Sequence, residues 1–444
     1  MTRRWESTAA TFLTAWASFI AACGEDDPAT ARDGGADGLP VEATPTADEC
    51  GAPAAATLEH AAVAEGHCAW LFADALSTPR GIVVDASGDV LVVERGEGQV
   101  TALYDDDGDR VSGESERSVL VPGSAGLGLN HGLFIHEGHL YASSTTTVYR
   151  WPYTAGARSE LGTPEEVVHS LPSGGHFTRT LVAKDGDSWL YVSVGSESNV
   201  DDDSSRSRVM RYDLSSMPGG GYEWTEGEVF ADGLRNEVGL AFDDQGRLWG
   251  VQNGVDNLSR DDLGGDIHND NPAEEVNLLD EAGRFHGYPY CWTEFDLPSD
   301  VGMGPGTQWV HENFMGMEDW SDAWCRDPDN VVPPVFSMQA HLAPLDMMFY
   351  DGDGLAPAFE GDAFVANHGS WNRVPAVGYD VVRLVFTGPS AIARADPVLE
   401  YVGSGVNNPV EWPHRPVGLA MAEDGALLVT SDASDRVLAV GATR

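Results

Sequence analysis

The sequence predicts an all-β fold, a six-bladed β-propeller. Two apolar segments separated by a Gly-containing turn form a hairpin pattern that occurs six times along the chain. Repeats of roughly 40 to 50 residues, each with several short strands, are typical of propellers, whose blades bury their faces only against neighbouring blades. The chain contains 51 Gly residues and shows no long stripe of helical period between residues 75 and 441. The hairpin segments are residues 79–94, 130–143, 178–193, 235–250, 343–366 and 415–430.

Segment 235–250 shows the pattern most clearly. A polar pair, Arg235 and Asn236, precedes an apolar strand, a turn follows at Asp243–Gly246, and a second apolar strand completes the hairpin. The polar pair is therefore expected at the open end of the hairpin. Because the repeat runs through most of the chain, we expect one catalytic propeller domain over residues 50–444 rather than several domains.

The chain is strongly acidic, with a formal net charge of −46 at pH 7. Nucleic acids and anionic lipid surfaces bind proteins through clustered cations, so both are excluded as partners. A solvated acidic surface explains most of this charge. Carboxylates gathered for calcium are compatible with that explanation, because calcium is held by oxygen ligands.

Residues 1–22 have the features of an export signal. Two arginines precede an apolar run, Ala9–Ala22, that is too short to span a bilayer. The run ends in Ile-Ala-Ala-Cys, which resembles a bacterial lipobox, so we expect a lipoprotein signal peptide, a lipid on Cys23 and anchoring at the cell envelope by that lipid only. An ordinary secretory signal is the alternative. Residues 23–49 carry few large apolar side chains and predict a disordered acidic tether.

Four cysteines follow the predicted processing site: Cys50, Cys68, Cys291 and Cys325. An even number in an exported protein indicates disulfides, and four cysteines allow three pairings. We favour Cys50 with Cys68 and Cys291 with Cys325, because each pair brackets a segment that lies outside the repeat. A metal site is disfavoured because no CxxC or neighbouring His spacing occurs.

Equivalent positions at the open ends of the hairpins carry polar side chains. In a propeller these ends surround the central channel, so residues far apart in sequence meet in one pocket. A single His or Arg of this kind is usually a structural side chain or part of a surface ion pair. Repetition at equivalent positions instead indicates a pocket for a polyanion. The residues are Arg80, Asn130, His131, His176, Arg179, Arg235, Asn236, His368, Trp371, Arg373, His414 and Arg415.

Two acidic segments are candidate cation sites. Asp105, Asp107 and Asp109 alternate around a Gly, and we interpret them as a solvated turn without the closing Glu of an EF-hand. Segment 252–289 interrupts the repeat with hard oxygen ligands and Gly residues, which favours calcium. Its His residues lack a transition-metal spacing such as HExxH. Its oxygen-bearing side chains include Asp256, Asp266, Asn269, Asp270, Glu274 and Glu275.

A Trp-rich insertion is predicted at about residues 285–335. Aromatic faces beside a polar pocket suit a sugar ring, but the same side chains would equally well pack an insertion fixed by a disulfide, and the sequence leaves both roles open. The chain contains no GxSxG motif and no Gly-rich phosphate loop at these positions. A hydrolase triad and a nucleotide cofactor are therefore disfavoured.

Taken together, the motifs resemble those of the pyrroloquinoline quinone (PQQ)-dependent glucose and sorbosone dehydrogenases, and are nearer to the sorbosone dehydrogenase-like and pyranose dehydrogenase branches. The resemblance implies a six-bladed propeller that oxidises sugars with PQQ and Ca²⁺ by hydride transfer from the anomeric or aldehyde-hydrate carbon. It also implies an electron acceptor, a cytochrome or a quinone, that the sequence does not identify. The motifs are PRGI, LNHGL, TRTL, LRNEVGLAF, NGVDNL, LGGDIHNDNPAEEVN, GYPYCW, HGSWNR and HRPVG.

The resemblance assigns roles to individual residues. His176 corresponds to the general base that takes the proton of the sugar hydroxyl. The backbone carbonyls of Gly254 and Val255 would hold calcium, with Glu275 nearby; Val255 replaces a Pro of the soluble glucose dehydrogenase branch, and that branch's Lys near the quinone is missing here. The residues expected around PQQ are Arg235 and Asn236 beside the quinone carbonyls, Arg80, Arg373 and Arg415 at the carboxylates, and His368 and Trp371 at the flanks.

Two other function classes are alternatives. A calcium-dependent lactonase-type propeller would carry Glu, Asn and Asp side chains at the open ends of the hairpins. A non-catalytic binding propeller tethered to a membrane would need no convergent cations there. The four arginines Arg80, Arg235, Arg373 and Arg415 disfavour both alternatives.

Overall fold

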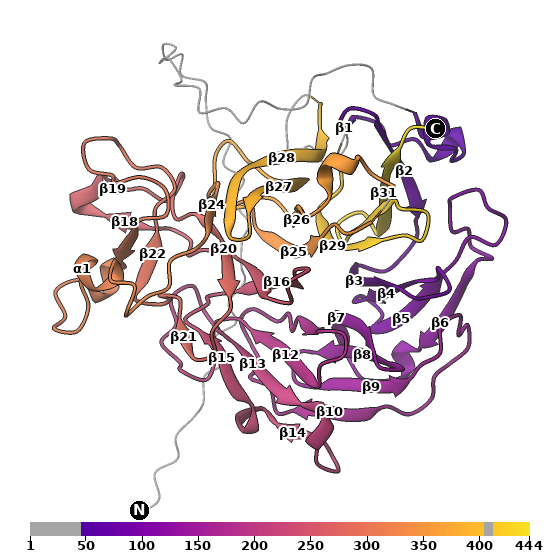
Figure 1. Cartoon of the computed structure of the whole chain (residues 1–444), viewed down its shortest axis with the longest axis horizontal. Coiled ribbons are helices and arrows are strands. Elements are labelled where there is room, and N and C mark those ends of the chain that lie inside the picture. Colours follow the sequence, from indigo (N-terminus) through magenta and orange to yellow (C-terminus); the bar gives the residue numbers. More distant parts are fainter. Residues whose placement is uncertain (1–45, 353, 404–411) are drawn as a thin grey trace, which may run out of the picture. The chain divides into compact units, whose positions relative to one another are not determined.

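A computed structural model of the chain describes residues 46–352, 354–403 and 412–444 and confirms the all-β, six-bladed propeller (Figure 1). The predicted signal peptide, Cys23 and most of the predicted tether lie outside the described residues. Within the described ranges the helices are short, and none has the length and apolar composition needed to cross a membrane. The fold therefore depends on strands throughout.

Each of the six predicted hairpins forms the two inner strands of one blade. Blade 1 contains β3 (Pro79–Val84), β4 (Val90–Glu94), β5 (Gln99–Leu103) and β6 (Arg117–Val121). Blade 2 contains β7 (Leu129–His136), β8 (His139–Ser144), β9 (Val148–Pro152), β10 (Glu165–His169) and the short β14 (Tyr222–Glu223). Blade 3 contains β11 (Leu181–Ala183), β12 (Trp189–Val194), β13 (Arg208–Asp213), β15 (Glu228–Asp232) and β21 (Arg284–Phe285).

The remaining blades follow the same order. Blade 4 contains β16 (Glu237–Phe242), β17 (Leu248–Gln252), β20 (Glu274–Leu279) and β24 (Phe336–Met338). Blade 5 contains β25 (Pro344–Phe349), β26 (Ala363–Asn367), β27 (Asp380–Gly388), β28 (Ala391–Tyr401) and β1 (Ala61–Val63). Blade 6 contains β29 (Pro416–Met421), β30 (Leu427–Ser431), β31 (Arg436–Ala442) and β2 (His67–Ala73).

Shorter elements connect the blades. Between β17 and β20 lie β18 (Ser259–Arg260) and β19 (Gly265–Asp266), which pair with each other, and after β21 lie the paired β22 (Cys291–Thr293) and β23 (Gln308–Val310) and the helix α1 (Asp322–Cys325). The 3₁₀ turns are η1 (Ala47–Cys50), η2 (Ala54–Ala56), η3 (Gly123–Ala125), η4 (Leu214–Ser216), η5 (Trp224–Glu226), η6 (Asp261–Leu263), η7 (Glu312–Phe314) and η8 (Pro357–Phe359).

The propeller closes by pairing strands from the two ends of the described chain. β2 runs antiparallel to β31, with Trp70 opposite Ala439, so a strand that precedes the repeat becomes the outer strand of blade 6. β1 likewise pairs with β28 at the outer edge of blade 5. These pairings cover edges that would otherwise expose unpaired backbone groups.

Inner strands are buried on both faces because each blade packs between two others. Every residue of β4, β26 and β30 is buried, whereas β28 on the outside is mostly exposed or half-buried. Large aromatic side chains fill the spaces between blades: Trp151 packs between blades 1 and 2, and Trp249 between blades 4 and 5. Burying one such side chain contributes about 3 kcal/mol of transfer free energy.

Glycine allows neighbouring hairpins to approach closely at the channel. A Cβ atom on Gly81 would lie 1.9 Å from the carbonyl oxygen of His131, and one on Gly132 would lie 2.3 Å from the carbonyl oxygen of Arg179. The first strand of one blade therefore packs directly against the open end of the next hairpin. This contact brings the open ends together around the channel.

Both predicted disulfides are confirmed. Cys50 and Cys68 have a Cα–Cα distance of 5.9 Å and join η1 to β2. Cys291 and Cys325 have a Cα–Cα distance of 5.8 Å and join β22 to α1. Each bond therefore fixes a segment that lies outside the repeated hairpins.

The tryptophans of the predicted insertion pack within it. Trp292 and Trp309 are buried and stacked, with ring centroids 6.3 Å apart, and Trp320 stacks on Tyr290 at 4.2 Å. None of these side chains belongs to the lining of the cavity described below. Of the two roles left open by the sequence, the structure supports packing for these residues.

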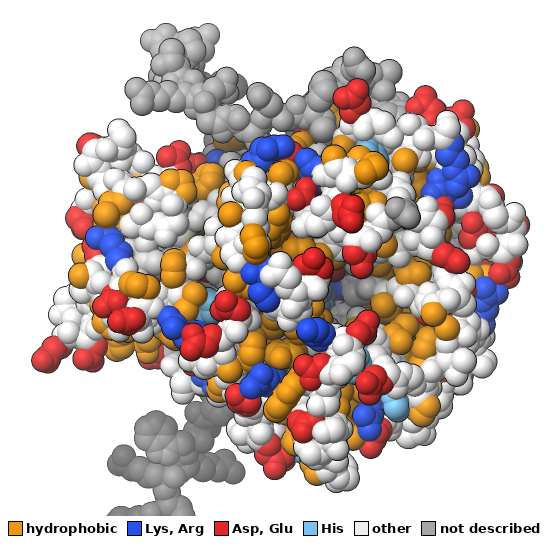
Figure 2. All heavy atoms as spheres, viewed as in Figure 1, with side chains coloured by type: hydrophobic (Ala, Val, Ile, Leu, Met, Phe, Trp, Pro, Cys, Tyr) orange, Lys and Arg blue, Asp and Glu red, His pale blue; other side chains and the backbone are white. Residues whose placement is uncertain are grey.

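Acidic side chains are scattered over the visible face of the molecule rather than gathered in one patch (Figure 2). Several form ion pairs with arginines on neighbouring strands in the outer part of a blade, such as Arg211 with Glu228 and Arg150 with Glu165. This distribution agrees with a solvated acidic surface.

Candidate active site

A cavity of about 430 Å³ lies where the open ends of the hairpins meet. Most of its side chains come from residues just before or at the start of the first inner strands and from residues directly after the second inner strands; Glu274 instead begins the third strand of blade 4, β20. Because both positions lie at the channel end of a hairpin, residues from distant parts of the chain share one surface. The charged, polar and aromatic lining includes Arg80, Arg95, His176, Phe177, Arg235, Asn236, Asn253, Asp256, Glu274, His341, His368, Trp371 and Asp432.

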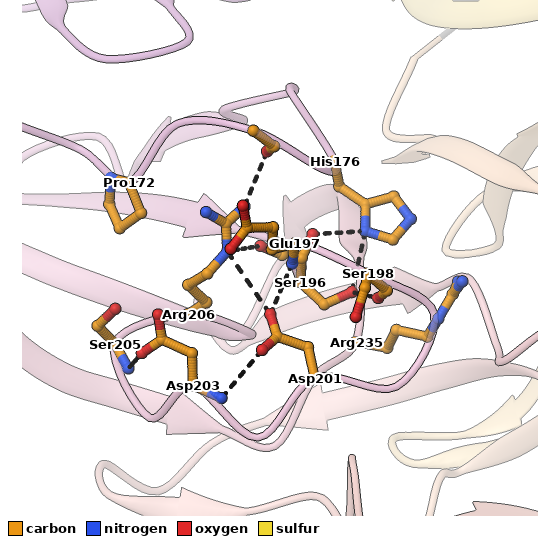
Figure 3. Close-up of polar contacts among 12 residues, drawn as sticks. Pro172, His176, Ser196, Glu197, Ser198, Asp201, Asp203, Ser205, Arg206 and Arg235 are labelled. Atoms are coloured by element: carbon orange, nitrogen blue, oxygen red, sulfur yellow. Dashed lines mark hydrogen bonds and ion pairs between the residues drawn. The ribbon is translucent and has the colours of Figure 1, made fainter. Parts of the chain in front are cut away.

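His176 lies in the loop between β10 and β11 and faces the cavity (Figure 3). Its Nδ1 atom is 2.9 Å from the backbone oxygen of Ser196 and 3.0 Å from the Ser196 hydroxyl. Burial lowers the pKa of His176 to about 4, and the positive charge of Arg235 acts in the same direction. The imidazole is therefore neutral at neutral pH.

Arg235 is almost completely buried and is held by oxygen atoms on several sides. Its guanidinium donates to the Asn199 side chain at 3.0 Å and to the Asn253 backbone oxygen at 3.3 Å. It also forms an ion pair with Asp256 at 3.0 Å. The neighbouring Asn236 lines the cavity too. The polar pair predicted at this hairpin end thus faces the pocket, with the guanidinium in a fixed position.

Asp432 joins two predicted residues from different blades. One carboxylate oxygen lies 2.5 Å from Arg80, and the other lies 2.8 Å from Nε2 of His368. Burial alone would raise the pKa of Asp432, but the hydrogen bond and charge of His368 and the charge of Arg80 bring it below its ordinary value. Burial lowers the pKa of His368 despite this partner. Asp432 was not predicted from the sequence.

Arg95 is a second cavity residue that the sequence analysis missed. Its guanidinium lies 4.1 Å from the ring centroid of Phe177, and Arg80 lies over the same ring at 5.5 Å. Arg80 has a carboxylate partner, whereas Arg95 forms no ion pair with any residue in the described part of the chain. Arg95 is also exposed, so its charge is free to meet a ligand. Its position directly after β4 is the signal that would have found it.

Of the three residues predicted to hold or adjoin calcium, Gly254, Val255 and Glu275, only Gly254 lines the cavity. Gly254 lines the cavity, and its N–H donates to Glu274 at 2.7 Å. Glu274 also lines the cavity, and burial raises its pKa to about 7. Glu275 points to the other face of β20, where Gln252 donates to it at 2.6 Å and Thr293 also hydrogen-bonds to it. Successive strand residues face opposite sides, so Glu274 rather than Glu275 faces the pocket. The side chain of Val255 packs in the core of the insertion.

Several predicted residues lie outside the lining. Arg415 donates to the backbone oxygens of His368 and Gly369 at 2.9 and 2.7 Å, and Arg373 pairs with Asp270 at 2.7 Å. Both arginines therefore support the loop after β26, which carries His368 and Trp371. Trp371 itself is 72% exposed at the rim of the cavity.

The remaining candidates lie behind the lining and hold its loops. His131 accepts a hydrogen bond from Arg80 at 3.2 Å, and Asn130 donates to Thr145 at 2.8 Å. Arg179 is fully buried and donates to backbone oxygens, including that of His176 at 2.8 Å. His414 contacts the Ser434 hydroxyl at 2.9 Å. These side chains stabilise the open ends of the hairpins.

A separate acidic loop lies between β5 and β6. Asp105, Asp107 and Asp109 offer ligand atoms within 4.8 Å of one another, the one such group found among the described residues. Glu116 closes this loop, since its carboxylate accepts from the backbone N–H groups of Asp106 at 2.8 Å and Gly113 at 2.9 Å. The sequence interpretation of a turn without a closing Glu overlooked this residue.

Comparisons with known proteins agree with the fold and with the motifs. The model of the TrAA12-like family matches residues 61–443. The pyrroloquinoline quinone-dependent pyranose dehydrogenase of Coprinopsis cinerea is 33% identical over 400 residues, which are 82% of this chain and 52% of that protein. The chain thus spans about half the length of this relative.

Two solved structures are similar over nearly their full length. The holo form of the pyranose dehydrogenase PQQ domain from Coprinopsis cinerea has a TM-score of 0.75 and 30% identity, covering 88% of this chain and 98% of that one. The calcium structure of family AA12 from Trichoderma reesei has a TM-score of 0.76 and 29% identity, covering 87% and 98%. These matches confirm the family that the motifs predicted, and the chain belongs to the TrAA12-like family.

Proposed function

We propose that this chain is a PQQ- and calcium-dependent sugar dehydrogenase. The observation that carries the proposal is the convergence of three guanidinium groups and a neutral histidine in one cavity at the end of the channel. The similar proteins named as PQQ-dependent pyranose dehydrogenase and its PQQ domain support it. Export and a lipid anchor at Cys23 belong to the same proposal, because a signal and tether are expected from the sequence.

The charges of the cavity suit PQQ together with a divalent cation. Arg80, Arg95 and Arg235 supply three positive charges, and Asp256 and Asp432 offset two of them. Glu274 adds a third carboxylate, which burial makes easier to protonate. PQQ carries three carboxylates, so the side chains alone would not balance it, and Ca²⁺ supplies the missing positive charge.

The chain's own residues have distinct tasks in this proposal. Arg95 and Arg80 would bind carboxylate groups of the cofactor, and Arg235 would donate to its quinone oxygens. The backbone oxygens of Gly254 and Val255 and the carboxylate of Glu274 would hold calcium. PQQ, when bound, supplies the quinone that accepts the hydride of the sugar's anomeric or aldehyde-hydrate carbon. Trp371 at the rim offers an aromatic face to the sugar.

His176 acts on the proton of the substrate. Its Nε2 atom accepts the proton of the sugar hydroxyl while the adjacent carbon loses its hydride, so the two changes leave a carbonyl product. A neutral imidazole is required for this task, and the lowered pKa of His176 provides it above about pH 4. The electrons then pass to an acceptor in the compartment to which the protein is exported.

The three cavity guanidiniums disfavour a lactonase-type function, for which carboxylates and amides would be expected around a lone metal.

The test of the proposed function is reconstitution of the purified protein with PQQ and Ca²⁺, followed by dye-linked oxidation of a panel of aldoses and pyranoses. Sugar-dependent dye reduction that needs both PQQ and Ca²⁺ is the expected result. Lactone hydrolysis without PQQ, or no binding of PQQ at all, would overturn the proposal.

A further inference from the structure

The hydrogen bonds at His176 assign its tautomer. Its Nδ1 atom faces the backbone oxygen of Ser196 at 2.9 Å, and a carbonyl oxygen only accepts hydrogen bonds. The Ser196 hydroxyl, 3.0 Å from Nδ1, donates its own proton to the backbone oxygen of Ser198 at 2.7 Å, so it accepts from the ring. Figure 3 shows both contacts of Nδ1 with Ser196. Nδ1 therefore carries the hydrogen, and the lone pair lies on Nε2.

The loop that contains Ser196 is tied to the loop that contains His176. Arg206 is 3% exposed and donates to the backbone oxygens of Ser173 at 2.8 Å and Gly174 at 2.9 Å on the His176 side. It donates to the backbone oxygen of Gly195 at 3.2 Å on the Ser196 side. One guanidinium thus fixes the distance between the two loops.

We infer that Ser196 and Arg206 are positioning residues that hold His176 in the Nδ1–H tautomer, with the Nε2 lone pair facing the cavity. Neither residue is in the cavity lining, so both act through His176. The inference rests on the proposed function, in which that lone pair is the base that accepts the proton of the sugar hydroxyl. The tautomer itself does not depend on the cofactor and is testable in its absence.

The charges around His176 favour the neutral ring. Three arginines act on it, namely Arg235, Arg206 and Arg179, and all three disfavour the imidazolium. The Ser196 loop carries two carboxylates on this side: Glu197, which packs beside Gly174, and Asp201, which accepts from the backbone N–H of Glu197 at 2.7 Å and lies 3.9 Å from Arg206. Neither is a hydrogen-bond partner of Nδ1. The partner of Nδ1 is therefore a neutral oxygen, which fixes the tautomer without attracting a second proton.

The first experiment measures the tautomer in the PQQ-free protein by ¹⁵N NMR of labelled histidine. The His176 signals, assigned by their loss in His176→Gln, should show a protonated Nδ1 and an unprotonated Nε2 at neutral pH. Ser196→Ala removes the hydroxyl acceptor but keeps the backbone acceptor, so Nδ1 should stay protonated while its ¹⁵N signal shifts. Ser204→Ala, at an exposed residue in the same loop, should leave the signals unchanged. A protonated Nε2 in the wild-type protein would overturn the inference whether or not PQQ binds.

The second experiment uses the PQQ- and calcium-loaded enzyme. Ser196→Ala should lower kcat about fivefold or more with little change in KM, as expected for loss of one hydrogen bond that orients the base. Ser196→Asp places a carboxylate beside Nδ1 and should move the acidic limb of the pH profile upward by about one unit or more. Arg206→Lys cannot bridge three carbonyl groups and should lower kcat in the same way. An unchanged pH profile in correctly folded Ser196→Asp would contradict the assigned role.

Discussion

Replacing His176 with Gln tests the assignment of the base. The substitution keeps a polar side chain of similar length but removes the group that accepts a proton. General base catalysis contributes about 10²- to 10⁴-fold in rate, so kcat should fall within that range. PQQ affinity should change little, because the guanidiniums of Arg80, Arg95 and Arg235 remain in place.

The effect on stability should be small. His176 loses its contacts with Ser196, which are worth about 1 kcal/mol, so the melting temperature should fall by only a few degrees. Circular dichroism and a PQQ absorbance titration establish that the variant is folded and loaded. Dye-linked turnover then measures the rate loss separately from binding.

The pH dependence provides a second check on the same residue. Proton uptake by His176 removes the lone pair, so kcat/KM of the wild type should decline as the pH falls through about 4. The folded-state pKa lies below the ordinary value of 6.5, so the unfolded chain binds this proton more readily, and the contribution of His176 to stability decreases as the pH falls from 6.5 towards 4. Full turnover by His176→Gln at saturating PQQ and Ca²⁺ would refute the assignment.

Three further predictions follow from particular contacts. Arg95→Gln should raise the Kd for PQQ by about tenfold or more, as loss of one charge-assisted hydrogen bond implies, while thermal unfolding stays unchanged because Arg95 is exposed and has no carboxylate partner among the described residues; unchanged affinity would contradict its role. Cys291→Ser should lower the free energy of unfolding by about 2–4 kcal/mol in chemical denaturation, because the bond closes a loop with a sequence separation of 34; equal stability would argue that the insertion needs no cross-link. Gly81→Ala should lower the melting temperature and the soluble yield, because the new methyl group would meet the His131 carbonyl oxygen at 1.9 Å; a fully stable variant would show that the two blades can separate.

The fold could be predicted because each blade repeats the same local pattern. A Gly-containing turn between the strands marks every hairpin, and four of the six also have a glycine near the start of the first strand: Gly81, Gly132, Gly239 and Gly418. Gly81, for example, is required by contact with the next blade. The outer strands β1 and β2 could not be assigned to blades 5 and 6, because their pairing joins residues from opposite ends of the chain.

The site could be predicted only in part. The repeated hairpin pattern predicted the residues that precede or begin the first inner strands, namely His176, Arg235 and Arg80. Arg95 and Asp432 directly follow second inner strands, where the residue type differs from hairpin to hairpin, so no repeated pattern marks them. Glu275 was predicted near the calcium, but Glu274 faces the cavity. Successive residues of a strand face opposite sides, so a shift of one residue decides which carboxylate faces the cavity.

The acidic loop between β5 and β6 shows another limit of prediction from the sequence. Asp105, Asp107 and Asp109 were recognised by their spacing, but Glu116 lies eleven positions beyond the first of them and was not connected with the loop. The backbone hydrogen bonds that turn its carboxylate inward become evident only in three dimensions.

Anaerobic stopped-flow absorbance of the PQQ- and calcium-loaded protein tests the central claim most directly. Mixing with an aldose or pyranose should change the spectrum of the bound cofactor in a single turnover, at a rate that His176→Gln lowers by about 10²-fold or more. The same spectrum before and after mixing, with PQQ bound and every sugar at saturating concentration, would contradict the claim that this cavity oxidises sugars.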